Sequence, residues 1–153
     1  MKKLIAGFIL LVISLGTLFV LSSSKADCVN LYIDYGPLNN GAVIERCVPV
    51  TGDVMALDLI ASVNLSTEGT QKYGNAVLCR LNGLPSKEVE TCEVMPSENT
   101  YWAVLIKEHE IIPFPFDLKG EWGWAQVGIN ELHLHAGDSL GLVFSDNGEV
   151  KFP

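Results

Sequence analysis

The sequence predicts an α+β domain in which small antiparallel or mixed sheets pack around one main helix and are held by disulfides. Several short segments alternate apolar and polar residues, which is typical of half-buried strands. One segment, residues 53–64, instead places its apolar residues at helical spacing. Four cysteines follow an apolar N-terminal run, and an even number of cysteines in an exported domain favours disulfides.

The N-terminus has the order of a secretory signal. Two lysines precede an uncharged apolar run at residues 4–21, and the small residues Ser24 and Ala26, on either side of Lys25, suit a cleavage site. We therefore expect residues 1–26 to be a signal peptide and residues 27–153 to form a single domain. Because the run also reaches the lower limit for a membrane-spanning helix, an uncleaved anchor is the alternative. In both cases the domain is expected to be secreted or held in the cell envelope.

The charge balance excludes one class of partner. The chain carries 10 basic and 18 acidic side chains, a net charge of −8. Removal of the predicted signal takes away three lysines and leaves 7 basic against 18 acidic side chains, a net charge of −11. A surface this acidic repels phosphate backbones, so nucleic acid is not an expected partner.

Strands and a hairpin are expected first. Residues 28–35 alternate strictly, with Val29, Leu31 and Ile33 on one face. Turn residues at 36–41 lead into a second strand at 42–50. The four cysteines allow three pairings, and we favour the two local ones, Cys28–Cys47 across this hairpin and Cys79–Cys92.

A helix and further strands follow. Asp53 is expected to cap a helix that Asn64 closes. After it come a loop at 65–74, a strand at 75–81, an irregular acidic segment at 84–99, a buried strand at 101–106 and a loop at 107–120. The C-terminal part is expected to be β, with residues 129–135 pairing with residues 139–144 around a turn.

Two histidines suggest a metal site. His133 and His135 are two residues apart, so on a strand both imidazoles point to the same side. Asp138 and His109 are candidate third ligands. The simpler interpretation, which we favour, places both histidines on the exposed side of a half-buried strand. We expect no metal and no cofactor.

Enzyme activity is not expected. The chain has no GxSxG motif and no glycine-rich phosphate loop. Its cysteines are expected to be oxidised, which leaves no thiolate nucleophile.

Aromatic residues gather between positions 101 and 124 and include all three tryptophans. They are Tyr101, Trp102, Phe114, Phe116, Trp122 and Trp124. Trp122 and Trp124 would present two rings on one face of a strand, a surface on which a flat ligand can stack. The alternative is that these rings fill the core, which is favoured for Trp102.

The order of several short motifs is similar to that of the transcobalamin-like C-terminal domain family. The matching segments are Thr51-Gly52-Asp53 with the following Ala56-Leu57-Asp58-Leu59-Ile60, then Tyr73-Gly74, Leu81-Asn82-Gly83-Leu84, Tyr101-Trp102, and Gly137-Asp138 with Val143-Phe144. They run in the family's order over nearly the whole chain after residue 27. The resemblance implies an α+β domain of small sheets around a single helix.

The resemblance also implies a function. In the vertebrate cobalamin carriers this domain closes over a corrinoid held by a helical domain, which this sequence lacks. We therefore expect an extracytoplasmic, non-enzymatic module that captures a corrinoid or another flat, partly apolar ligand through Tyr101, Trp102, Trp122 and Trp124. It would deliver the ligand to a membrane importer or a second envelope protein. The alternative is a cell-surface protein–protein interaction domain without a small ligand.

Overall fold

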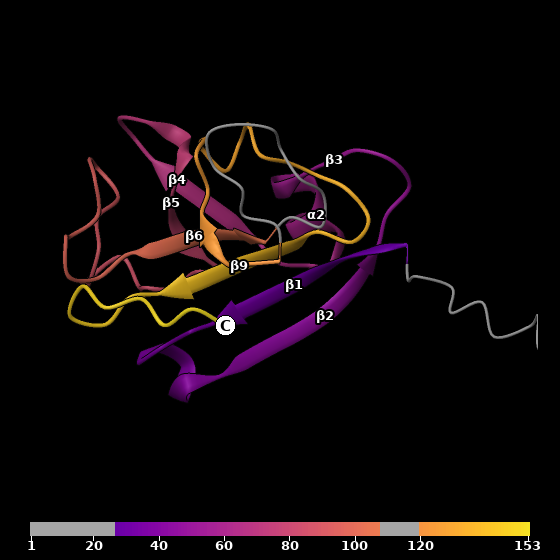
Figure 1. The fold of residues 1–153 in the computed structure, drawn as a ribbon. Helices are drawn as coiled ribbons and strands as arrows, with labels where there is room; N and C mark the ends of the chain where they lie inside the picture. Colours follow the sequence, from indigo (N-terminus) through magenta and orange to yellow (C-terminus); the bar gives the residue numbers. More distant parts are fainter. Residues whose placement is uncertain (1–26, 108–119) are drawn as a thin grey trace, which may run out of the picture.

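The computed structural model describes residues 27–107 and 120–153. The predicted signal peptide, residues 1–26, lies outside the described residues. Over these two ranges the fold is mostly β, with one short α-helix, a five-stranded mixed sheet, two small sheets and two disulfides (Figure 1). Among the residues described, no helix is long and apolar enough to cross a membrane.

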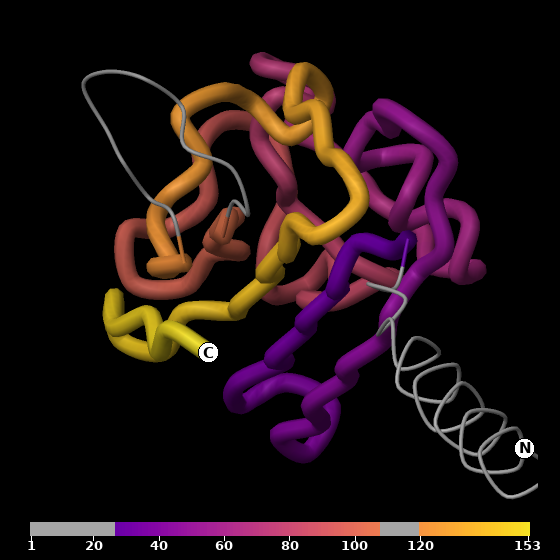
Figure 2. The backbone as a smooth tube through the Cα atoms, turned by 45° about the vertical axis from the view of Figure 1, so that its right-hand side comes forward, coloured from indigo at the N-terminus to yellow at the C-terminus, as the bar shows by residue number. Residues whose placement is uncertain are grey.

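The five-stranded sheet has the order β2-β1-β9-β6-β7. Its strands are β1 (Cys28–Asp34), β2 (Val43–Pro49), β6 (Trp102–Lys107), β7 (Gly123–Trp124) and β9 (Ser139–Phe144). β1 runs antiparallel to β2, as the predicted hairpin requires, and parallel to β9. The turn between β1 and β2 contains a short 3-10 helix, η1 (Leu38–Gly41). Figure 2 shows this hairpin, coloured indigo to purple, extending away from the rest of the fold.

The predicted pairing of residues 129–135 with residues 139–144 is wrong. Every residue of β9 is buried, so this strand needs neighbours on both sides and lies in the middle of the large sheet. Its partners are β1 and β6, which are distant in sequence. The segment before it forms only β8 (His133–Leu134) and pairs with β3 (Val54–Met55).

The helix α2 (Ala56–Ser62) begins later than the sequence predicts, and Asp53 does not cap it. Met55 occupies the capping position without a side-chain hydrogen bond. Residues 54 and 55 are extended because they pair with β8, and the Ala56 N–H donates to the Leu132 carbonyl at 2.9 Å. Tertiary strand pairing thus sets the start of the helix in place of a local cap.

A strand lies inside the segment predicted as a loop at 65–74. β4 (Thr67–Thr70) pairs antiparallel with β5 (Gly74–Leu81), with irregular register around Gly69. An added Cβ at Gly69 would lie 2.2 Å from the Gly74 carbonyl oxygen. The glycine therefore allows the two strands to approach closely at the bulge.

The main core lies between the large sheet and α2. Leu31 and Ile33 on β1 and Leu142 on β9 are fully buried, and they belong to one cluster with Leu59 and Ile60 of the helix. Burial of each such side chain contributes about 1.5–3 kcal/mol. The alternation read from residues 28–35 therefore identified the buried face of β1 correctly.

The two disulfides join Cys28 to Cys47 and Cys79 to Cys92, the pairing favoured from the sequence. Their sequence separations of 19 and 13 residues correspond to roughly 3 kcal/mol of stabilisation each, through the entropy of the unfolded chain. Two disulfides indicate an oxidising, extracytoplasmic environment.

Candidate functional site

The face of the large sheet opposite α2, called the outer face below, carries most of the predicted aromatic site. Because side chains alternate along a strand, the residues between the core positions of β1, β6 and β9 point to this side. Ala103, Leu105 and Val143 form a small buried cluster there. Tyr32, Tyr101, Trp122 and Val150 pack against this cluster and are partly exposed.

The indole of Trp122 lies against the sheet directly over Gly141 of β9. A Cβ added to Gly141 would lie 3.0 Å from Trp122 Cζ3 and 3.1 Å from the Cβ of Leu105. The missing side chain of Gly141 therefore makes the space into which the indole fits. The Tyr32 ring lies beside it, with 6.4 Å between the ring centroids and a tilt of 56°.

Among the predicted aromatic residues that the structure describes, Trp124 is the most exposed, at 44%. It pairs with Leu105 in the register of β6 and β7, and so it points to the same face as Leu105. Its ring lies 6.4 Å from that of Tyr101 and 6.1 Å from that of Phe152. The two tryptophans thus share the outer face, as their spacing predicts, but each has its own aromatic neighbours.

A hollow of ≈ 410 Å³ opens on the outer face beside Trp122 and Tyr32. Asn30, Glu45, Arg46 and Pro153 are among its other lining residues. It combines two aromatic rings with polar groups of both charges, and the Cys28–Cys47 disulfide fixes the strand on which Glu45 and Arg46 lie.

A second hollow of ≈ 520 Å³ continues along the outer face toward the far end of β1. Asp34, Val43 and Val143 line it together with Asp146 and Lys151 of the C-terminal segment. Tyr32 lines the first hollow and does not line the second.

The surroundings of Tyr32 raise the pKa of its phenol above the ordinary value of 10.0. Partial burial raises the pKa of its phenol, and the carboxylates of Asp34 and Glu45 raise it further. Asp34 and Glu45 lie on the same face of the sheet as Tyr32, since Glu45 is its partner across the hairpin. A neutral phenol can donate a hydrogen bond to a ligand lying over the sheet.

Trp102 belongs to the core and not to this surface. It is 4% exposed, and its indole N–H donates to the Leu84 carbonyl at 3.0 Å. Its ring makes edge contacts with Tyr35 and Phe144, at centroid distances of 5.4 and 5.3 Å. A ring enclosed in this way fills the core, so Trp102 is not a ligand-stacking residue on the outer face. The predicted positions Phe114 and Phe116 lie outside the described residues.

His133 and His135 follow the simpler interpretation of their spacing. Their side chains are 55% and 59% exposed, while Leu132 and Leu134, which alternate with them, are buried. The strand therefore presents its leucines to the core and its histidines to the solvent.

Each histidine has an acidic neighbour of its own. His133 Nδ1 lies 2.7 Å from Asp53 Oδ2, and His135 Nδ1 lies 3.8 Å from Asp138 Oδ2. Within residues 27–107 and 120–153, no three metal-ligating side chains come together. The remaining candidate ligand, His109, lies outside the described residues.

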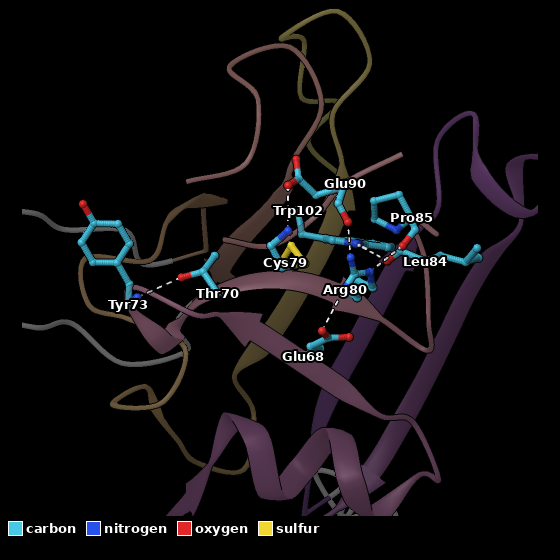
Figure 3. The surroundings of a disulfide bond; sticks show 10 residues. Glu68, Thr70, Tyr73, Cys79, Arg80, Leu84, Pro85, Glu90 and Trp102 are labelled. Carbon is cyan, nitrogen blue, oxygen red and sulfur yellow. Dashed lines mark hydrogen bonds and ion pairs between the residues drawn. A yellow bond between two sulfur atoms is a disulfide. The ribbon is translucent and has the colours of Figure 1, made fainter. Parts of the chain in front are cut away.

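Arg80 is a buried charge that sequence reasoning missed. It is 2% exposed, its Nε donates to the Pro85 carbonyl at 2.9 Å, and one of its terminal nitrogens donates to the Glu90 carbonyl. Its Nη1 forms an ion pair with Glu68 at 2.6 Å (Figure 3). Together with the neighbouring Cys79–Cys92 disulfide, Arg80 fixes the irregular segment after β5.

Two other contributors to the outer face were also missed. Tyr32 was not singled out, although a tyrosine between two core positions of β1 indicates an aromatic residue on the outer face. Phe152 lies close to Trp124 only because the C-terminal segment returns over the sheet, which no local pattern indicates. Comparison of the chain with known protein families, curated proteins and solved structures gave no match.

Proposed function

We propose that this protein is an extracytoplasmic binding module that holds a flat, partly apolar ligand against the outer face of its large sheet. The observation that carries the proposal is the placement of Trp122 over Gly141, beside Tyr32 and an open hollow of ≈ 410 Å³. Rings that the sheet supports from below lose little freedom when a ligand stacks on them.

A corrinoid is the ligand class that we propose first. Aromatic side chains supply the stacking surface, and the phenol of Tyr32 with the side-chain amide of Asn30 supplies hydrogen-bond donors for amide side arms. The hollow is open, so it covers only one side of a flat molecule. This agrees with the resemblance to the transcobalamin-like C-terminal domain, in which a second domain covers the other side. An importer or a second envelope protein would take that place here.

We propose binding without catalysis. All four cysteines of the chain are in disulfides, so none offers a thiolate. The polar groups at the hollow are suited to hydrogen bonding with a bound molecule.

The test is equilibrium dialysis of residues 27–153, with both disulfides formed, against cobalamin and cobinamide. We expect saturable binding that weakens about tenfold in Trp122→Ala, which corresponds to about 1.4 kcal/mol. Tyr73→Ala is the matched control, because Tyr73 is 43% exposed but lies on the β4–β5 turn. If Trp122→Ala and Trp124→Ala both bind like the unchanged protein, the stacking mechanism is wrong.

A protein partner on the same face is the second candidate function. Trp124 and Phe152 are 44% and 46% exposed and pack edge to face. Exposed aromatic pairs of this kind are frequent anchors of protein interfaces. A pull-down from envelope extract that recovers a partner with the unchanged protein, and not with Trp124→Ala, would favour this function over ligand capture.

A further inference from the structure

The β2 strand forms one edge of the large sheet. In the sheet order it is paired only with β1, and among the described strands none lies on its other side (Figure 1). The strand is seven residues long, and most of its residues are exposed. The opposite edge is the two-residue strand β7, so β2 is the longer free edge of this sheet.

The hydrogen-bonding direction of β2 follows from the two ends of the hairpin. The Tyr35 N–H donates to the Ala42 carbonyl, and the Val50 N–H donates to the Asp27 carbonyl, both at 3.0 Å. Directly opposite residues are therefore hydrogen-bonded at both ends, and in an antiparallel pair hydrogen-bonded pairs recur at every second residue. In the register of the hairpin, the backbone N–H and carbonyl groups of residues 44, 46 and 48 point toward β1. The N–H and carbonyl groups of residues 43, 45 and 47 point the other way, out from the edge of the sheet.

These outward groups have no partner within the described part of the chain. No backbone or side-chain hydrogen bond there involves the N–H or carbonyl of Val43, Glu45 or Cys47 outside the β1 ladder. Pro49 comes next in the same alternation, at a position where the absent N–H costs no hydrogen bond to β1. The edge thus offers three donors and the matching carbonyls at the spacing of one added strand.

A second copy of β2 does not suit this edge. Two antiparallel copies that share one sheet must pair the outward residues with each other. The register that aligns the whole strand places Arg46 opposite Arg46. Of the two registers that align five residues, one places Glu45 opposite Glu45, and the other pairs Glu45 with Pro49, which has no N–H for the ladder. Like charges directly opposite each other destabilise a strand pair.

We propose that β2 binds an extended peptide segment of another protein as an additional antiparallel strand. The segment has an acidic residue opposite Arg46 and, next along its chain, a basic residue opposite Glu45. Its residues opposite Ile44 and Val48 are apolar, because these two side chains pack against the core. The partner is therefore a protein with an exposed strand of the pattern apolar–any–acidic–basic–apolar. Glu45 and Arg46 also line the hollow beside Trp122, but the added strand pairs with the backbone of β2, and the inference does not depend on ligand binding in that hollow.

The test uses the exported protein, with both disulfides formed, and two hexapeptides of identical composition. The first, Val-Thr-Glu-Lys-Val-Thr, has the proposed charge order, and the second, Val-Thr-Lys-Glu-Val-Thr, reverses it. Amide exchange and chemical shifts are followed by NMR during titration. We expect the amides of Val43, Glu45 and Cys47 to exchange fast in the free protein and to become protected by the first peptide. The second peptide should bind about tenfold more weakly.

A charge-reversed protein completes the test. In the double variant Glu45→Lys, Arg46→Glu both changes are at exposed positions, and the peptide preference should reverse. Equal affinity for the two peptides, or no binding of either, would overturn the proposal. So would protection of the three amides that rises with protein concentration alone, because that result would assign the edge to a second copy.

Discussion

Gly141→Ala is the substitution that most directly examines how the outer face is built. The added methyl group would lie 3.0 Å from Trp122 Cζ3, 3.4 Å from Trp122 Cη2 and 3.1 Å from the Cβ of Leu105. Favourable carbon–carbon contacts lie at about 3.5–4.0 Å, so these atoms must separate by several tenths of an ångström. Leu105 Cβ is fixed by the β6 backbone, whereas the indole of Trp122 lies on the surface. The ring should therefore move away from the sheet.

Overpacking of this kind costs about 1–3 kcal/mol, and the partial exposure of Trp122 places the expected loss near the lower end, at about 1 kcal/mol. Urea unfolding measures the change in stability, and the indole N–H resonance of Trp122 reports the movement of its ring. Ile60→Val is the control, because it costs about 0.5–1.5 kcal/mol in the core behind the sheet without contact with the outer face. If Gly141→Ala leaves both stability and the Trp122 resonance unchanged, the indole does not rest on the sheet as described.

Three further predictions concern single side chains elsewhere. Arg80→Met should lower the free energy of unfolding by about 3–5 kcal/mol in urea titrations, because two main-chain carbonyls and one carboxylate lose their buried partner. Trp102→Ala should cost about 3–5 kcal/mol in the same assay, whereas Trp124→Ala, at a 44% exposed position, should cost less than about 1 kcal/mol; equal losses would contradict the assignment of Trp102 to the core. The raised pKa of Tyr32 means that the folded state holds the phenolic proton more tightly than the unfolded chain, so its stabilising contribution is complete below pH 10.0 and is lost as the pH rises through the folded pKa. An ultraviolet titration should show a phenol that ionises above pH 10.0 in the unchanged protein and is lost in Tyr32→Phe. If both proteins give the same titration curve, this prediction is wrong.

The sequence predicted features that depend on neighbouring residues. The alternation in residues 28–35 identified β1 and its buried face, and the cysteine spacing identified both disulfides. Features that depend on distant pairing were not predicted. Asp53 has the residue type of a helix cap, but its carboxylate lies 2.7 Å from a histidine that is 80 positions away. In the same way β9 pairs in parallel with β1, at the other end of the chain.

In the candidate site, too, the sequence predicted what depends on neighbouring residues and missed what depends on distant pairing. The spacing of Trp122 and Trp124 placed both rings on one face because alternation is a local property of extended chain. The same clustering also suggested Trp102, whose neighbour Tyr101 lies on the outer face while Trp102 itself points inward. That aromatic residues are close together in the sequence does not show which side of a strand each one faces. The space for Trp122 depends on Gly141, and this could not be inferred before β6, β7 and β9 were known to be neighbours.

The most direct test of the central claim is an NMR titration of the three indole N–H groups with cobinamide. If the ligand binds to the outer face, the resonances of Trp122 and Trp124 should shift with a common saturation curve. The resonance of Trp102, which donates to the Leu84 carbonyl in the core, should stay in place. Saturable binding that leaves Trp122 and Trp124 unshifted, or the absence of any saturable change, would contradict a ligand site on this face.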